Sequence, residues 1–146
     1  MAHLLRILIL VATLATCALN ASGANVLRGR HAMIEAPDGM SYDSALSAKM
    51  GMDVYRSRDN TILFAIGTQP PKPGVSALTL TAVLAGTSAG SVVKVNDRGV
   101  YAAFDGTRKR VFGVCQADGP MPVVLIIGDI ARADALRYIA TLCPAK

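Results

Sequence analysis

The stretch that decides the fold is residues 100–128, VYAAFDGTRKRVFGVCQADGPMPVVLIIG. It contains three short runs rich in β-branched and aromatic residues, at 100–104, 110–115 and 121–128. Turn-forming residues separate the runs, and the dipeptide Asp105-Gly106 is the clearest of these turns. Such runs joined by tight turns predict antiparallel strands, and the most apolar run, 121–128, is expected to be the most central strand.

Further hairpins are predicted upstream. Residues 50–56 alternate, residues 58–60 form a turn, and residues 61–66 return as an apolar strand. A second hairpin pairs residues 91–95 with the run at 100–104. Residues 32–36 indicate a short strand, whereas residues 25–31 read as a loosely held lead-in and residues 42–48 as a helical turn or an irregular crossing.

Residues 75–85 (VSALTLTAVLA) are ambiguous between strand and helix. Strand spacing places four apolar residues on one face, whereas helical spacing scatters them around the axis without an apolar stripe. We therefore expect a strand. A fully buried helix that begins after Ser76 and ends at Gly86 is the alternative.

The C-terminal segment predicts a helix. Asp129 suits an N-cap, residues 132–143 repeat at helical spacing, and Pro144 ends the repeat. This spacing places Cys143 in the last turn, on the face toward the core. Residues 25–146 are therefore expected to form one α+β domain, a mainly antiparallel meander of hairpins with a C-terminal helix packed on it and one disulfide.

Residues 1–24 have the pattern of a secretory signal peptide. A single positive charge at Arg6 precedes an apolar run at 7–19, and small residues at 20–24 suit cleavage. The run is shorter than the roughly 20 residues that span a bilayer. The alternative is lipidation at Cys17, although Thr16 stands where a lipoprotein signal usually has Gly, Ala or Ser. We expect a periplasmic or secreted protein.

Removal of the leader also removes Cys17, so only Cys115 and Cys143 remain. Two cysteines in an exported domain most simply form one disulfide. On the chain-entropy model such a bond stabilises the fold by about 3.5 kcal/mol. It would pin the C-terminal helix across the sheet.

Residues 86–90 (GTSAG) match the G-x-S-x-G pattern of a hydrolase nucleophile, Ser88. That elbow requires a helix after the serine, but VVKV and a hairpin turn follow it here. The only histidine after the leader, His31, lies upstream near a loose end. Ser91 and Lys94 match S-x-x-K, but in a strand they point to opposite faces. A small-residue turn is the preferred interpretation, and a hydrolase using Ser88 is the alternative.

The sequence also lacks the residue patterns that metal or phosphate binding requires. One histidine and two distant cysteines do not suit zinc, and no calcium-loop or phosphate-loop pattern occurs. We expect no metal and no cofactor. The formal net charge falls from +5 to +4 when Arg6 leaves, and with no tryptophan and few aromatics a nucleic-acid platform is not expected.

Charge singles out one cluster, Arg108, Lys109 and Arg110, beside the turn at Asp105-Gly106. The simplest interpretation is a solvated turn that discourages edge pairing. The functional interpretation adds Arg56 and Arg58 from the other hairpin and predicts a contact for an acidic partner, provided that both tips lie at one end of the sheet.

The sequence thus favours an exported, non-catalytic binding protein that acts on a protein partner, as an inhibitor, an immunity-type protein or an accessory subunit. The alternatives are a small secreted hydrolase and a lipid-anchored envelope component.

Overall fold

The computed structural model describes residues 25–70, 72–115 and 122–144, and the side chains of residues 143 and 144 are not part of that description. The predicted leader, Cys17 and the predicted turn at 117–120 lie outside the described residues.

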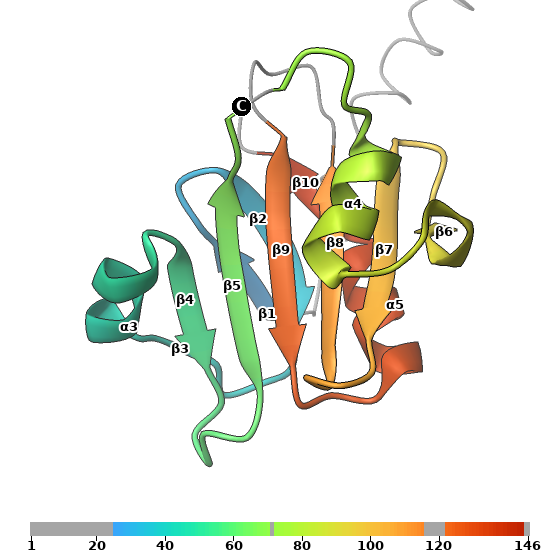
Figure 1. The fold of residues 1–146 in the computed structure, drawn as a ribbon. Helices are drawn as coiled ribbons and strands as arrows, with labels where there is room; N and C mark the ends of the chain where they lie inside the picture. The colour runs from blue at the N-terminus through green and yellow to red at the C-terminus, as the bar shows by residue number, and fades with distance from the viewer. Residues whose placement is uncertain (1–24, 71, 116–121, 145–146) are drawn as a thin grey trace, which may run out of the picture.

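A seven-stranded antiparallel sheet forms the centre of the domain (Figure 1). Its strands, in spatial order, are β3 (Ser41–Tyr42), β4 (Asp53–Arg56), β5 (Leu63–Thr68), β9 (Val123–Gly128), β8 (Arg110–Cys115), β7 (Val100–Asp105) and β6 (Val93–Lys94). Two local meanders, β3-β4-β5 and β6-β7-β8-β9, meet where β5 pairs with β9. The prediction of antiparallel hairpins is confirmed, and β9 is the central strand, as its composition predicted.

A second, three-stranded sheet was not predicted. It has the order β1 (Asn25–Arg28), β2 (Ala32–Ala36) and β10 (Cys143–Pro144). The prediction that residues 25–31 are a loose lead-in was wrong, because β1 pairs with β2 along its whole length and Leu27 is buried. A four-residue strand has little signal of its own, and its stability depends on its neighbours.

The prediction of a strand at 75–85 was also wrong, since residues Ala77–Ala85 form helix α4. Ser76 caps the helix by accepting a hydrogen bond from the Thr79 N–H, and Gly86 ends it in the left-handed region at φ 65°. The buried face consists of small residues and includes Thr81, whose hydroxyl donates to the Ala77 carbonyl at 2.6 Å. A buried face of this composition gives no apolar stripe in the sequence.

The C-terminal helix, α5 (Arg132–Ile139), is shorter than predicted. Its N-cap is Ala131 rather than Asp129, which adopts a left-handed φ of 57° while its N–H donates to the Lys109 carbonyl. Cys143 does not lie in the last turn of the helix. It belongs to β10, where it pairs with Met33 of β2.

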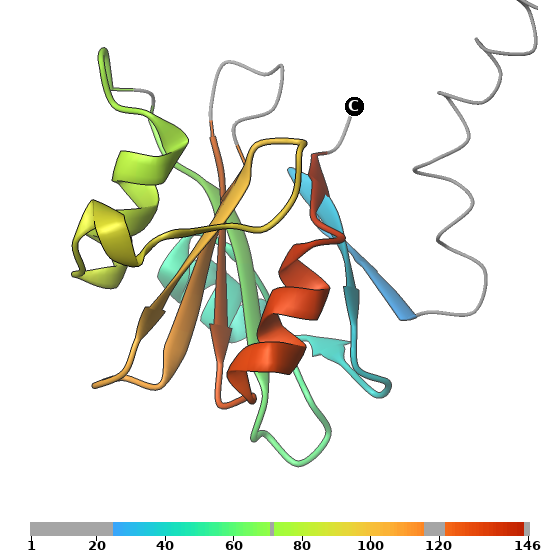
Figure 2. The same cartoon turned by 90° about the vertical axis from the view of Figure 1, so that its right-hand side faces the viewer.

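One helix packs on each face of the large sheet (Figure 2). Helix α4 packs on β7 and β8 from one side, and α5 packs on the same strands from the other side, next to the small sheet. Of the shorter elements, α3 (Ser44–Met50) contacts β4, and η1 (Ala89–Ser91) contacts α4. The main core lies on the α5 side and includes Phe64, Leu125 and Ile139. The predicted α+β class, with a C-terminal helix packed on an antiparallel sheet, is confirmed.

Candidate protein-binding surface

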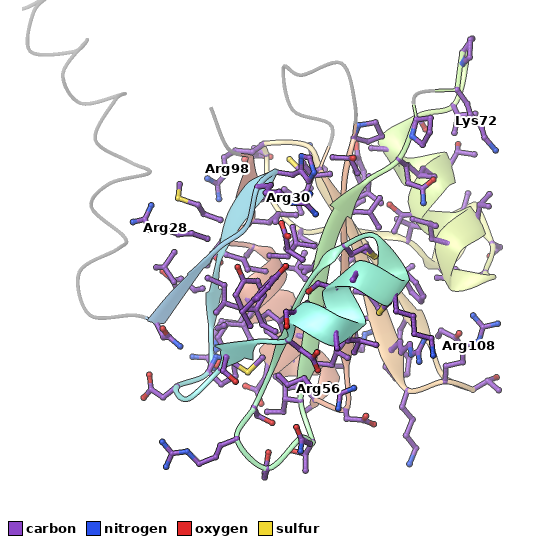
Figure 3. The ribbon with its side chains drawn as sticks, turned by 90° about the vertical axis from the view of Figure 1, so that its left-hand side faces the viewer. Arg28, Arg30, Arg56, Lys72, Arg98 and Arg108 are labelled. Carbon is purple, nitrogen blue, oxygen red and sulfur yellow. The ribbon has the colours of Figure 1, made fainter. Side chains whose placement is uncertain are left out.

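The two basic turns predicted from the sequence lie at the same end of the large sheet. The strand register places Arg56 opposite Leu63, Leu63 opposite Gly128, and Gly128 opposite Arg110. The turn after β4 and the turn before β8 therefore leave the sheet at one end. Figure 3 shows Arg56 and Arg108 at this end, whereas Arg30, Arg98 and Lys72 lie toward the opposite end. The condition for a shared basic surface, that both hairpin tips lie at one end of the sheet, is therefore met.

These four residues, which we call the basic row, share one face of the sheet: Arg56, Leu63, Gly128 and Arg110. Side chains alternate along a strand. The neighbours Phe64, Ile127 and Val111 pack into the core on the α5 side. The basic row therefore faces the α4 side, at the end of the sheet where the tips lie.

Arg110 has its charge available for a partner. It is exposed, and in the described part of the chain it forms no ion pair within 4 Å. The carboxylate of Asp105, its cross-strand neighbour, is used within the turn. Asp105 Oδ1 accepts hydrogen bonds from the N–H groups of Thr107 and Arg108, each at 3.1 Å. Asp105 Oδ2 also faces the Arg108 Nε at 3.6 Å.

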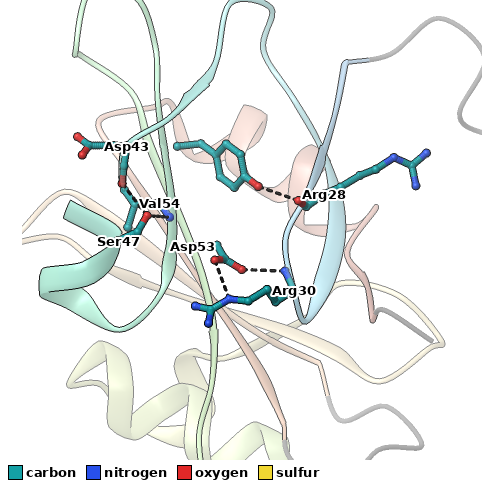
Figure 4. A network of polar contacts seen from close by, with 7 residues as sticks. Arg28, Arg30, Asp43, Ser47, Asp53 and Val54 are labelled. Carbon is teal, nitrogen blue, oxygen red and sulfur yellow. Dashed lines mark hydrogen bonds and ion pairs between the residues drawn. The ribbon is translucent and has the colours of Figure 1, made fainter. Parts of the chain in front are cut away.

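Arg56 is fixed at the other end of the row. Its Nε lies 3.2 Å from Asp43 Oδ2, in an ion pair that lacks hydrogen-bond alignment. Asp43 is itself held, since its Oδ1 accepts from the Leu46 N–H as the N-cap of α3. Figure 4 shows Ser47 joining the same network: its hydroxyl donates to the Asp43 carbonyl at 2.6 Å and accepts from the Val54 N–H at 2.9 Å. The position of Arg56 is therefore set by a packed helix end.

The other side of β4 is tied to the small sheet (Figure 4). Asp53 is only 4% exposed, and its carboxylate accepts from the Arg30 N–H at 2.8 Å and the Arg30 Nε at 3.1 Å. The Tyr55 hydroxyl donates to the Arg28 carbonyl at 2.8 Å. Burial raises the pKa of Tyr55, and the nearby Asp53 charge adds to the effect. These contacts anchor β4, the strand that carries Arg56, to the segment around β1.

Arg58 lies in an exposed turn with its own internal order. Asp59 accepts hydrogen bonds from the hydroxyls of Ser57 at 2.6 Å and Thr61 at 2.9 Å, and these bonds lower the pKa of Asp59. Arg58 forms no ion pair within 4 Å among the described residues. Its charge thus adds to the positive field of this end.

Three residues with side chains adopt a left-handed backbone in the described chain, and all three lie at the tips: Asn60 at φ 59°, Lys109 at φ 52° and Asp129 at φ 57°. Elsewhere in the described residues a positive φ is taken by glycine. A lysine in this conformation costs on the order of 1 kcal/mol relative to a relaxed backbone. Strain of this kind concentrates at functional sites.

Sequence reasoning missed two residues of this end. Arg132, the first residue of α5, places its guanidinium carbon 5.9 Å from the centre of the Phe104 ring, and Phe104 is 38% exposed. Gly128 separates the cations of the row, but its place there depends on the pairing of β5 with β9. No local pattern in the sequence reports that pairing.

Ser88 does not lie in a nucleophile elbow. Helix α4 precedes it where the motif requires a strand, and the single turn of 3-10 helix η1 follows it. Its Oγ contacts the Ser91 Oγ at 3.3 Å on an exposed surface. His31 lies between β1 and β2, and Figure 2 shows these strands across the large sheet from α4 and η1. The S-x-x-K lysine, Lys94, contacts Asp97 at 3.6 Å.

The residues expected to form the disulfide end up on different sheets. Cys115 is buried at the end of β8, and Cys143 lies in β10. The side chain of Cys143 is outside the described part, so the bond stays a prediction. If it forms, it joins the large sheet to the small one and does not pin α5 as expected.

Within the described ranges, no group of three or more His, Cys, Asp or Glu side chains is placed to hold a metal ion, and no helix has the length and hydrophobicity to cross a membrane. No protein-family model, curated protein or solved structure matches this chain.

Proposed function

We propose that this chain is an exported, non-catalytic binding protein that engages an acidic surface of a protein partner through its basic hairpin tips. The observation that carries this proposal is the strand register, which brings two basic turns from distant parts of the sequence to one end of the sheet. Arg58, Lys109 and Arg110 offer unpaired charges there, among the described residues.

Two features support a binding role for this end. One support of the row, β4, is held from two directions, because its Val54 N–H donates to Ser47 of α3 and its Asp53 accepts from Arg30 beside the small sheet. The row also combines two cations, Arg56 held by Asp43 and the exposed Arg110, with the apolar surface of Leu63, which suits a protein partner better than a purely electrostatic contact would. The action would be that of an inhibitor, an immunity-type protein or an accessory subunit in the periplasm.

The proposal is tested on the full chain, expressed with its own leader in a Gram-negative host and purified from the periplasm. The wild type is compared with a triple reversal, Arg108→Glu, Lys109→Glu and Arg110→Glu, in affinity capture from envelope extract. The matched control reverses three exposed cations away from the tips, Arg28→Glu, Lys49→Glu and Lys72→Glu, so that the net charge is the same.

We expect one stoichiometric partner that is retained by the wild type and the control, lost by the tip variant, and released by 1 M salt, where the screening length falls to about 3 Å. Equal retention by the tip variant and the wild type contradicts the proposal. Equal loss in both variants also contradicts it, because the effect then belongs to net charge.

A further inference from the structure

The basic row contains a gap between its two cations. A Cβ added to Gly128 would meet nothing within 4 Å beyond its chain neighbours, although the glycine itself exposes little surface. Leu63 on one side of it and Ile126 next to it on β9 are half-buried. The φ of Gly128 lies outside the left-handed region, so the backbone does not require glycine here. The missing side chain leaves room over an apolar floor.

The spacing of the row fits an extended peptide. Three strand-to-strand steps separate Arg56 from Arg110, which is about 14 Å at about 4.8 Å for each step. In an extended chain, residues i and i+4 point to the same side and lie about 13 Å apart. Residue i+2 points to the same side, midway between them. Two carboxylates and one apolar side chain at these positions match the row.

We propose that the partner presents an extended segment with an acidic residue, an apolar residue and a second acidic residue at alternate positions, lying across the strands of the basic row. One carboxylate pairs with Arg56, the other pairs with Arg110, and the apolar side chain fills the space over Gly128 and Leu63. The inference rests on the proposed function and adds the form of the segment that is recognised.

The probe is the synthetic peptide Ser-Glu-Thr-Val-Thr-Glu-Ser, added to the isotope-labelled protein at low salt and followed by NMR. We expect shifts at the amides of Leu63, Gly128 and Arg110, and none at Gly90 or Lys72. A peptide with glutamine in place of both glutamates should not bind. A peptide with its glutamates next to each other should bind about two- to five-fold more weakly, because one surface ion pair is lost.

A steric variant separates shape from charge. Gly128→Leu keeps every charge and fills the gap, so the dissociation constant for the peptide should rise at least ten-fold while the melting temperature is unchanged. Gly90→Leu is the matched control, because Gly90 is exposed, its nearest contact for an added Cβ is 4.0 Å away, and it lies in η1 beyond the end of α4. This variant should bind as the wild type does.

Normal peptide binding by Gly128→Leu overturns the inference. If the tip variant still loses its partner in that case, the proposed function stands and only the recognised segment is wrong. Binding to phosphatidylglycerol vesicles without binding to the peptide overturns both, since a lipid surface would then be what the cations meet.

Discussion

The close contact between β8 and α5 allows the packing of this fold to be tested by a double-mutant cycle. Gly113 faces α5, and a Cβ added there would lie 3.2 Å from Cγ2 of Ile139 and 3.5 Å from its Cγ1 and Cδ1. Ile139 is fully buried. The absence of a side chain at Gly113 is thus what allows Ile139 to approach the sheet.

Gly113→Val introduces three carbons into occupied space, and we expect it to lower the free energy of unfolding by about 2 kcal/mol. Ile139→Ala leaves a cavity and should lower it by about 3.5 kcal/mol. In the double variant the valine occupies part of that cavity. The total loss should then be about 4 kcal/mol, which implies a favourable coupling of about 1.5 kcal/mol.

Urea unfolding of the four proteins, followed by circular dichroism, measures these differences, provided that the slope with urea stays the same. Additive losses, with a coupling below about 0.5 kcal/mol, would show that the two side chains do not compete for one space. The position assigned to α5 on β8 would then be refuted.

Three further predictions concern the tips and the cysteines. Lys109→Gly should raise the free energy of unfolding by about 0.5–1 kcal/mol, because it relieves a left-handed lysine, yet weaken partner capture; a loss of stability in thermal unfolding would contradict the first part. The pKa of Asp59 should lie below its ordinary value of 3.8, because the hydroxyls of Ser57 and Thr61 donate to its carboxylate. Its contribution to stability is then present above pH 3.8 and is lost as the pH falls through the lower pKa of the folded state. A carbon-detected NMR titration with a midpoint at or above 3.8 would rule this out. The mature protein should weigh two hydrogens less than its reduced form, and replacing both Cys115 and Cys143 with serine should lower the free energy of unfolding by about 3.5 kcal/mol; an unchanged mass after reduction would exclude the bond.

Local sequence signals were sufficient for the main hairpins of the large sheet, but not for the pairing of β5 with β9 or for the small sheet. The run at 121–128 was expected to be central because it is apolar throughout, and β9 is the fourth of seven strands. The strand β1 had no comparable signal, since its stability comes from pairing with β2. The C-terminal end of α5 was predicted too late in the chain for a similar reason, because Cys143 pairs with Met33 of β2, which is distant in the sequence.

Helix α4 shows a different kind of failure, because the deciding signals were present in the sequence. Ser76 and Gly86 are the residues that begin and end it. The periodicity misled because the buried face is made of alanines and a threonine that satisfies its own hydroxyl, while Val83 is 69% exposed. Helix end signals deserve more weight than hydrophobic periodicity where the buried residues are small.

For the candidate surface, the sequence identified the cations but not their arrangement. Arg108, Lys109 and Arg110 were recognisable as a basic turn, and Arg56 and Arg58 as a second one. The two turns lie at the same end of the sheet because Leu63 pairs with Gly128 across its centre. No composition or spacing within either hairpin contains that information.

The seam between β5 and β9 also has a consequence for the folding kinetics of this protein. Each meander closes through contacts between neighbours in the chain, but the seam joins strands separated by residues 69–122. Closing so long a loop has a high entropic cost, and pairings of this kind form slowly. Arg56 and Arg110 therefore come into one row only when the seam has closed. A partner that contacts both cations together would bind the folded protein and not a chain in which the seam is still open, where each hairpin would present only its own charges.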